Sequence, residues 1–195
     1  FPEYSARIHS LRNALVEENN TLCHGDFSPK NLLLHPNGMT LVDHETAHFG
    51  DFTMDLGLFL AHLVLKCIYA KSNRSSYAEL VRSFLNTYQN HAGKCDLNVQ
   101  QSALGHLGVV LLTRVSGTSQ VDYLDKAQKQ EARMLAQTLL KGDTNNWESF
   151  PPCSWLLLLF FYHGKLGRTI NNHLRFVIVG RYLALYLNSF VVSVR

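Results

Sequence analysis

The chain has 195 residues, of which 46% are hydrophobic and 17% are charged, and its net charge is +3 at pH 7. This length and composition suit one globular core, so one domain or part of one is expected. The four cysteines show no C-x-x-C pair or regular spacing, which indicates neither a zinc site nor a disulfide framework; they are Cys23, Cys67, Cys95 and Cys153. A reducing, cytoplasmic location is therefore expected, and no secretory signal opens the sequence.

The first predicted element is an amphipathic helix from Pro2 to Glu18. Its apolar residues recur at intervals of three and four positions, which is the helical period; they are Tyr4, Ile8, Leu11 and Leu15. The pair Asn19–Asn20 is expected to end it. We expect this helix to pack under the loop formed by residues 24–31.

That loop has the sequence HGDFSPKN. Its spacing H-x-D-x-x-x-x-N is that of the catalytic loop of protein kinases, in which the Asp orients an acceptor hydroxyl and the Asn holds Mg²⁺. Three fixed positions alone are a weak signal, because short patterns arise by chance. The functional prediction therefore depends also on residues 32–58.

A β-hairpin is predicted directly after this loop. Two apolar runs, Asn31 to His35 and Met39 to Asp43, are joined by the turn residues Pro36-Asn37-Gly38. Such a hairpin would carry Asp43 back beside Asp26, so that the two acids converge.

These residue types suit phosphoryl transfer, in which catalysis rests on positioning the nucleophile and neutralising charge with Mg²⁺. Asp43, Glu45 and the amide oxygen of Asn31 are the hard oxygen ligands that Mg²⁺ prefers, which leaves Asp26 free as the base. Lys30 could neutralise the oxygens of the transferring phosphate, or it could be a solvated surface charge, which is the commoner role of a lysine in a loop.

HGDFSPKN followed by LVDHETAHFGDFTMDLG resembles the aminoglycoside phosphotransferase and choline kinase superfamily, and is also similar to methylthioribose kinase-like members. The superfamily pattern is close to H-G-D-x-x-x-x-N, then I-D-x-E-x-A-x-x-G-D-x-x-x-D-L. Every fixed position is matched, except that Val42 replaces Ile.

The resemblance implies roles for individual residues. Asp26 is expected to be the catalytic base, with Asn31 and Asp43 as Mg²⁺ ligands and Glu45 as a further ligand or a supporting acid. Asp55, at the start of the next helix, is expected to hydrogen-bond the backbone of the catalytic loop, and His24 to support the same loop. Mg²⁺ and ATP are the implied cofactors, the implied substrate is a small molecule bearing a hydroxyl group, and no nucleic-acid partner is expected.

The same acid cluster has an alternative interpretation. His44 and His48 are four residues apart and flank Asp43 and Glu45, and imidazole is a ligand of zinc and iron. On that interpretation the chain is a metal hydrolase.

Four more helices are predicted from apolar periodicity: Asp55–Lys71, Ser76–His91, Leu97–Arg114 and Asp125–Lys141. His62 is expected to be structural. Gly and hydroxyl residues between Leu112 and Leu124 predict a loop. Arg114 would there contact substrate or phosphate, or act as a structural hydrogen-bond donor.

The predicted fold class is α+β, mainly helical: a protein-kinase-like C-terminal lobe at residues 1–142, with a small β-hairpin at the catalytic and metal loops. The N-terminal lobe, which bears the nucleotide clamp in this superfamily, is expected to be absent, so the isolated chain is expected not to transfer phosphate. The expected function is that of a small-molecule kinase fragment. The alternative is a non-catalytic kinase-like binding or membrane-associated protein.

Residues 143–146 are predicted to be a polar linker, followed by an apolar, basic tail at 147–195. The tail has five Lys or Arg against one acid, whereas residues 1–146 have thirteen against fourteen. Its longest apolar stretch, Phe176 to Val194, is interrupted by Arg181 and Asn188, and a membrane span needs about 20 apolar residues. A buried helix or non-native sequence is therefore favoured over membrane contact.

Overall fold

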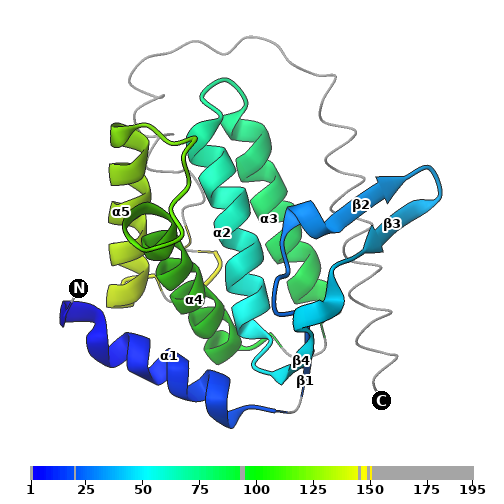
Figure 1. Cartoon of the computed structure of the whole chain (residues 1–195), viewed down its shortest axis with the longest axis horizontal. Helices are drawn as coiled ribbons and strands as arrows, with labels where there is room; N and C mark the ends of the chain where they lie inside the picture. The colour runs from blue at the N-terminus through cyan, green and yellow to red at the C-terminus, as the bar shows by residue number, and fades with distance from the viewer. Residues whose placement is uncertain (1, 20, 93–94, 145, 149, 151–195) are drawn as a thin grey trace.

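The structure is a computed structural model of the chain, and it describes residues 2–19, 21–92, 95–144, 146–148 and 150. The described part is mainly helical with two small antiparallel sheets, in agreement with the predicted fold class (Figure 1). Its α-helices are α1 (Ser5–Glu17), α2 (Thr53–Tyr69), α3 (Arg74–His91), α4 (Leu97–Ser116) and α5 (Lys126–Lys141). Its strands are β1 (Thr21–Cys23), β2 (Leu32–His35), β3 (Gly38–Leu41) and β4 (His48–Gly50), and its 3₁₀ turns are η1 (Pro2–Tyr4), η2 (Pro29–Asn31) and η3 (His44–Thr46).

Helix α2 is the centre of the helical body and packs against α3, α4 and α5 (Figure 1). It can be buried on most of its surface because nearly all of its residues are apolar. Gly57 allows α2 and α4 to approach closely, since a Cβ atom there would lie 2.5 Å from His106 Cβ and 2.7 Å from the Leu107 nitrogen. The first turn of α2, which carries Asp55, is thereby held in a fixed place.

A row of aromatic rings connects the helical body to the catalytic loop. The ring of Phe27 stacks on that of Phe59 in α2 at 4.7 Å, and Phe59 lies 4.6 Å from Phe84 in α3, measured between ring centroids. All three rings are buried. The residue directly after Asp26 is therefore anchored in the core.

Helix α1 packs chiefly against α4 and also touches β4. Leu11 is buried, and Arg7 donates from Nη2 to the carbonyl oxygen of Gln101 in α4 at 3.0 Å. The helix itself is confirmed, but its principal partner is α4 rather than the catalytic loop under which we expected it.

The predicted hairpin is confirmed: β2 pairs with β3 in the antiparallel register Leu32↔Leu41 and His35↔Gly38. It extends away from the helices (Figure 1). The sequence did not predict the second sheet, in which β1 pairs with β4 through Thr21↔Gly50 and Cys23↔His48. This sheet joins the start of the catalytic loop to the end of residues 42–47, here called the metal loop because it carries the predicted ligands Asp43 and Glu45, so the two loops are held side by side.

The core continues past the predicted linker. Trp147 and Phe150 are both buried in it, and the Trp147 backbone N–H donates to Gln100 Oε1 at 3.0 Å. The division of the chain at residues 142 and 146 remains a prediction. The two apolar stretches of the tail, Trp155 to Tyr162 and Phe176 to Val194, lie outside the described residues.

Two further observations concern the hydrophobic helices and the cysteines of the described residues. Among the described residues, no helix has the length and apolar character needed to cross a membrane. Cys23 and Cys95 carry free thiols.

Candidate active site

The catalytic loop, residues 24–31, is hydrogen-bonded to the first turn of α2. Asp55 accepts the backbone N–H of His24 at 2.6 Å on Oδ2 and that of Gly25 at 3.0 Å on Oδ1. This is the contact that the resemblance implies for Asp55. Burial raises the pKa of this carboxyl group, although the two N–H bonds favour its charged form. The two bonds fix the backbone directly before Asp26.

The ring of His24 joins the catalytic loop to the metal loop. Its Nδ1 accepts the backbone N–H of Asp26 at 3.2 Å, and its Nε2 lies 2.9 Å from the carbonyl oxygen of Val42. Because the Asp26 N–H can only donate, Nδ1 is the acceptor and Nε2 carries the proton donated to Val42. The His24 ring thus connects the carbonyl of Val42, the residue before Asp43, to the backbone N–H of Asp26.

The backbone at Gly25 leaves no room for a side chain. Its φ of +82° is in the left-handed region, and a Cβ atom would lie 2.5 Å from the carbonyl oxygen of Thr46. Thr46 also donates from Oγ1 to the carbonyl oxygen of His24 at 3.0 Å. Nothing in the sequence motif indicated this role for Thr46 except its position next to Glu45.

Asp26, Lys30 and Asn31 form one hydrogen-bonded group. Lys30 Nζ lies 2.8 Å from Asp26 Oδ2, and Asn31 Nδ2 donates to the same oxygen at 3.2 Å and to the Asp26 carbonyl at 2.8 Å. Since the amide nitrogen of Asn31 faces Asp26, its Oδ1 remains without a hydrogen bond in the part of the chain that the structure describes. The proposed base and a predicted metal ligand are thereby held together.

The charges of this group favour an ionised base. Burial works against the carboxylate of Asp26, but the hydrogen bonds from Lys30 and Asn31 outweigh it and lower the pKa of Asp26 below its ordinary value. The hydrogen bond to Asp26, the charge of Asp26 and, more weakly, that of Asp43 raise the pKa of Lys30. Asp26 and Lys30 are therefore a carboxylate and an ammonium at neutral pH.

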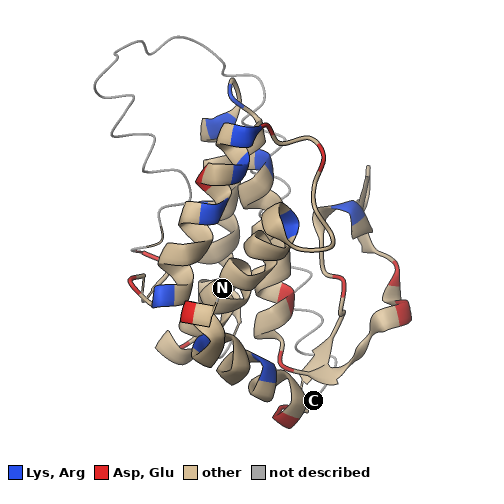
Figure 2. Ribbon diagram, turned by 60° about the vertical axis from the view of Figure 1, so that its left-hand side comes forward, with Lys and Arg blue, Asp and Glu red and all other residues tan. Residues whose placement is uncertain are grey.

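The hairpin brings Asp43 next to Asn31, because the backbone N–H of Val42 donates to the Asn31 carbonyl at 3.0 Å. Asp43 has φ 70° and ψ 51°, a left-handed conformation that non-glycine residues adopt rarely and Asp tolerates better than most. Its side chain is exposed, as is that of Glu45. In Figure 2 the acids of this region gather in the loops beside the hairpin, while most Lys and Arg lie on the helices.

This donor set fits Mg²⁺. The oxygens of Asp43, Glu45 and Asn31 are hard ligands, few in number and open to solvent, and Mg²⁺ usually keeps several waters beside one or two carboxylates. The hairpin register and the hydrogen bond from the Val42 N–H to the Asn31 carbonyl bring the backbones of Asn31 and Asp43 close together. The ligand assignment itself stays a prediction.

The alternative transition-metal cluster does not form. Within the described ranges, no group of three or more His, Cys, Asp or Glu side chains gathers so as to hold a metal ion. His44 donates from Nε2 to the Leu41 carbonyl at 2.9 Å, and His48 donates from Nδ1 to the Thr46 carbonyl at 2.9 Å. Each imidazole thus donates one ring N–H to the backbone of its own loop.

Two residues singled out in the sequence lie near this group. Arg114 is in the last turn of α4, not in a loop, and its Nη1 donates to Ser119 Oγ at 2.7 Å, which favours the structural interpretation. His62 in α2 has a buried Nε2 with no hydrogen-bond partner among the described residues. Burial, and next the charge of Arg114, lower the pKa of His62, so its ring is neutral.

Comparison with known proteins agrees with this geometry. Residues 2–93 match the model of the phosphotransferase enzyme family. The chain is similar to methylthioribose kinase of Bacillus cereus strain B4264, with 22% identity over 151 residues that cover 67% of this chain and 38% of the relative. It is also similar to methylthioribose kinase of Geobacillus thermodenitrificans strain NG80-2, with 24% identity over 155 residues that cover 67% of this chain and 39% of the relative.

The family resemblance predicted from the sequence is therefore confirmed. The chain spans under two fifths of the length of these curated relatives, which it covers to 38% and 39%.

Proposed function

We propose, from the match of residues 2–93 to the model of the phosphotransferase enzyme family, that this chain carries the acceptor-binding and metal-binding part of a small-molecule kinase. The kinase would move the γ-phosphate of ATP to a substrate hydroxyl. One observation carries the proposal: Asn31 donates to Asp26 and keeps its amide oxygen unengaged within the described residues, beside the hairpin that delivers Asp43.

In this proposal Asp26 is the base. Its Oδ2 holds two donors, Lys30 and Asn31, so Oδ1 is the atom that would accept the proton of the acceptor hydroxyl. Asp55 and His24 keep that carboxylate in place through the loop backbone. When bound, Mg²⁺–ATP supplies the phosphoryl group and neutralises its charge; Asn31 and Asp43 would hold the metal, and Glu45 would assist them.

The relatives suggest the substrate class. Both curated relatives are named methylthioribose kinase, so a small sugar-like hydroxyl compound is the first acceptor to test. Because the chain covers so little of those kinases, we propose that the residues which hold the nucleotide base are contributed by a part of the kinase other than residues 2–150. The described residues would then be its C-terminal lobe.

The proposal is tested by the variant Asp43→Asn in a form of the protein that transfers phosphate to methylthioribose or another hydroxyl acceptor. Asn keeps the left-handed backbone that Asp43 needs, so the fold should be retained while one metal-binding charge is lost. We expect the Mg²⁺ concentration for half-maximal rate to rise about tenfold or more. Phosphate transfer is followed by ³¹P NMR during a Mg²⁺ titration.

Asp96→Asn is the matched control, because Asp96 caps α4 at the surface and Asn caps a helix nearly as well. An unchanged Mg²⁺ requirement in Asp43→Asn would remove Asp43 from the metal site. Absence of phosphate transfer to every hydroxyl acceptor tried would contradict the proposed function.

A further inference from the structure

Lys30 occupies an unusual place for a largely exposed lysine. Its ammonium group lies 2.8 Å from Asp26 Oδ2, although 61% of the Lys30 side chain and 28% of the Asp26 side chain are exposed. Asp43 is the second acid whose charge acts on Lys30. The ammonium group therefore lies on the proposed base and feels the charge of a proposed metal ligand, in the region of the site where a transferring phosphoryl group must lie.

The ion pair with Lys30 makes Asp26 less able to accept a proton. A carboxylate oxygen that holds an ammonium group and an amide N–H is stabilised in its charged form, so it is a weaker proton acceptor. Lys30 is held only by this contact in the described residues, and its flexible stem is exposed. It can thus leave Asp26 without unpacking the core.

We propose that Lys30 is a further catalytic residue of this site, whose ammonium group neutralises Asp26 and Asp43 in the empty site and transfers to the phosphoryl oxygens when phosphate arrives. The inference rests on the proposed function. In the reaction, the acceptor oxygen bonds to the γ-phosphorus, the bond from that phosphorus to the ADP oxygen breaks, and the acceptor proton passes to Asp26 Oδ1. Lys30 keeps its protons throughout.

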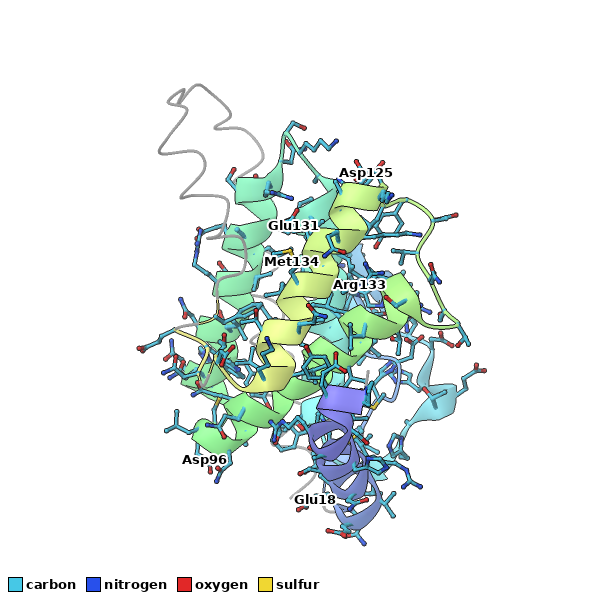
Figure 3. The ribbon with its side chains drawn as sticks, turned by 90° about the vertical axis from the view of Figure 1, so that its left-hand side faces the viewer. Glu18, Asp96, Asp125, Glu131, Arg133 and Met134 are labelled. Atoms are coloured by element: carbon cyan, nitrogen blue, oxygen red, sulfur yellow. The ribbon has the colours of Figure 1, made fainter. Side chains whose placement is uncertain are left out.

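The first test measures Mn²⁺ binding to the nucleotide-free full chain by electron paramagnetic resonance. Lys30→Met removes a positive charge next to the proposed metal site and so lessens its repulsion of a cation, and Mn²⁺ should therefore bind about tenfold more tightly. Lys30→Arg keeps the positive charge and should bind Mn²⁺ as the wild type does. The control is Lys71→Met, because Lys71 also pairs with an acid, at 3.4 Å from Asp125 Oδ2, but does so at the start of α5 (Figure 3).

The second test measures tripolyphosphate binding at saturating Mn²⁺ by calorimetry. Lys30→Met should weaken this binding about tenfold, and Lys30→Arg should restore it to within about threefold of the wild type. A merely structural lysine would move neither measurement. Circular dichroism of each variant checks that the fold is unchanged.

The outcomes separate this inference from the proposed function. Tighter Mn²⁺ binding with weaker tripolyphosphate binding in Lys30→Met supports the transfer of Lys30 from acid to phosphate. Unchanged Mn²⁺ binding, or unchanged tripolyphosphate binding, overturns it while the metal site stands. If Mn²⁺ binds to no variant at millimolar concentration, the proposed metal site fails and the inference fails with it.

Discussion

Replacing Asp26 by Asn should lower turnover about 10²-fold or more while leaving the KM for the nucleotide nearly unchanged, as expected for a base that acts in the transition state. The amide of Asn has the same shape and can still accept from Lys30 and Asn31, so the loop should keep its fold. The amide cannot, however, accept the proton of the acceptor hydroxyl. Steady-state kinetics at saturating acceptor, in a form of the protein that transfers phosphate, measure the loss.

The pH profile provides a second readout for Asp26. Hydrogen bonds from Lys30 and Asn31 outweigh burial and lower its pKa, so the base stays ionised below the ordinary carboxyl range. The pKa of Asp26 is lower in the folded protein than in the unfolded chain, so the ionised carboxylate stabilises the fold. This stabilisation is fully present at pH values above the unfolded-state pKa and is lost as the pH falls through the folded-state pKa. The wild-type kcat/KM should therefore show no acid limb from Asp26 above about pH 5. Wild-type turnover in Asp26→Asn would remove Asp26 from the base role.

Replacing Asp55 by Asn should lower the free energy of unfolding by about 2–3 kcal/mol and reduce turnover as well. Asp55 accepts two backbone N–H groups, one on each carboxylate oxygen, in a buried place. An amide offers one oxygen and one NH₂ group, so at least one backbone N–H of His24 or Gly25 would lose its acceptor and face another donor. Urea denaturation followed by circular dichroism gives the stability change.

The control for Asp55 is Asp96→Asn, at the N-terminal end of α4 (Figure 3). Asp96 is exposed and its Oδ1 accepts only the Val99 N–H, at 3.0 Å, which Asn can also cap, so the expected loss is within about 0.5 kcal/mol. An equal decrease in the free energy of unfolding in the two variants would show that the hydrogen bonds from the catalytic loop to Asp55 contribute little to stability.

The helices and the hairpin were predictable because their signals are local. Four or five turns of apolar periodicity indicate α2 and α5, and Pro36-Asn37-Gly38 between two apolar runs indicates the hairpin. The pairing of β1 with β4 was not predictable, since three-residue strands are too short to show alternation and residues 24–47 separate these two in the sequence. Yet this sheet is what holds the two loops together.

The residue types of the candidate site were predictable from the motif, but their contacts were not. The sequence does not show that Asp43 takes a left-handed backbone, because Asp adopts that conformation only occasionally and is far more often in other conformations. The approach of the Thr46 carbonyl to Gly25 and the bridge from His24 to Val42 depend on tertiary packing of two loops. The helix predicted from periodicity and the loop predicted from Gly and hydroxyl residues overlapped at Arg114, which the structure places in the last turn of α4.

The central claim is that Asn31 and Asp43 hold one metal ion beside Asp26. The most direct measurement is the anomalous scattering of Mn²⁺ in crystals of the chain grown with Mn²⁺ and tripolyphosphate. The account predicts a peak within bonding distance of Asn31 Oδ1 and an Asp43 carboxylate oxygen, with phosphate oxygens on its open side. A peak bound by His44 or His48 instead, or no peak between the catalytic loop and the hairpin, would contradict it.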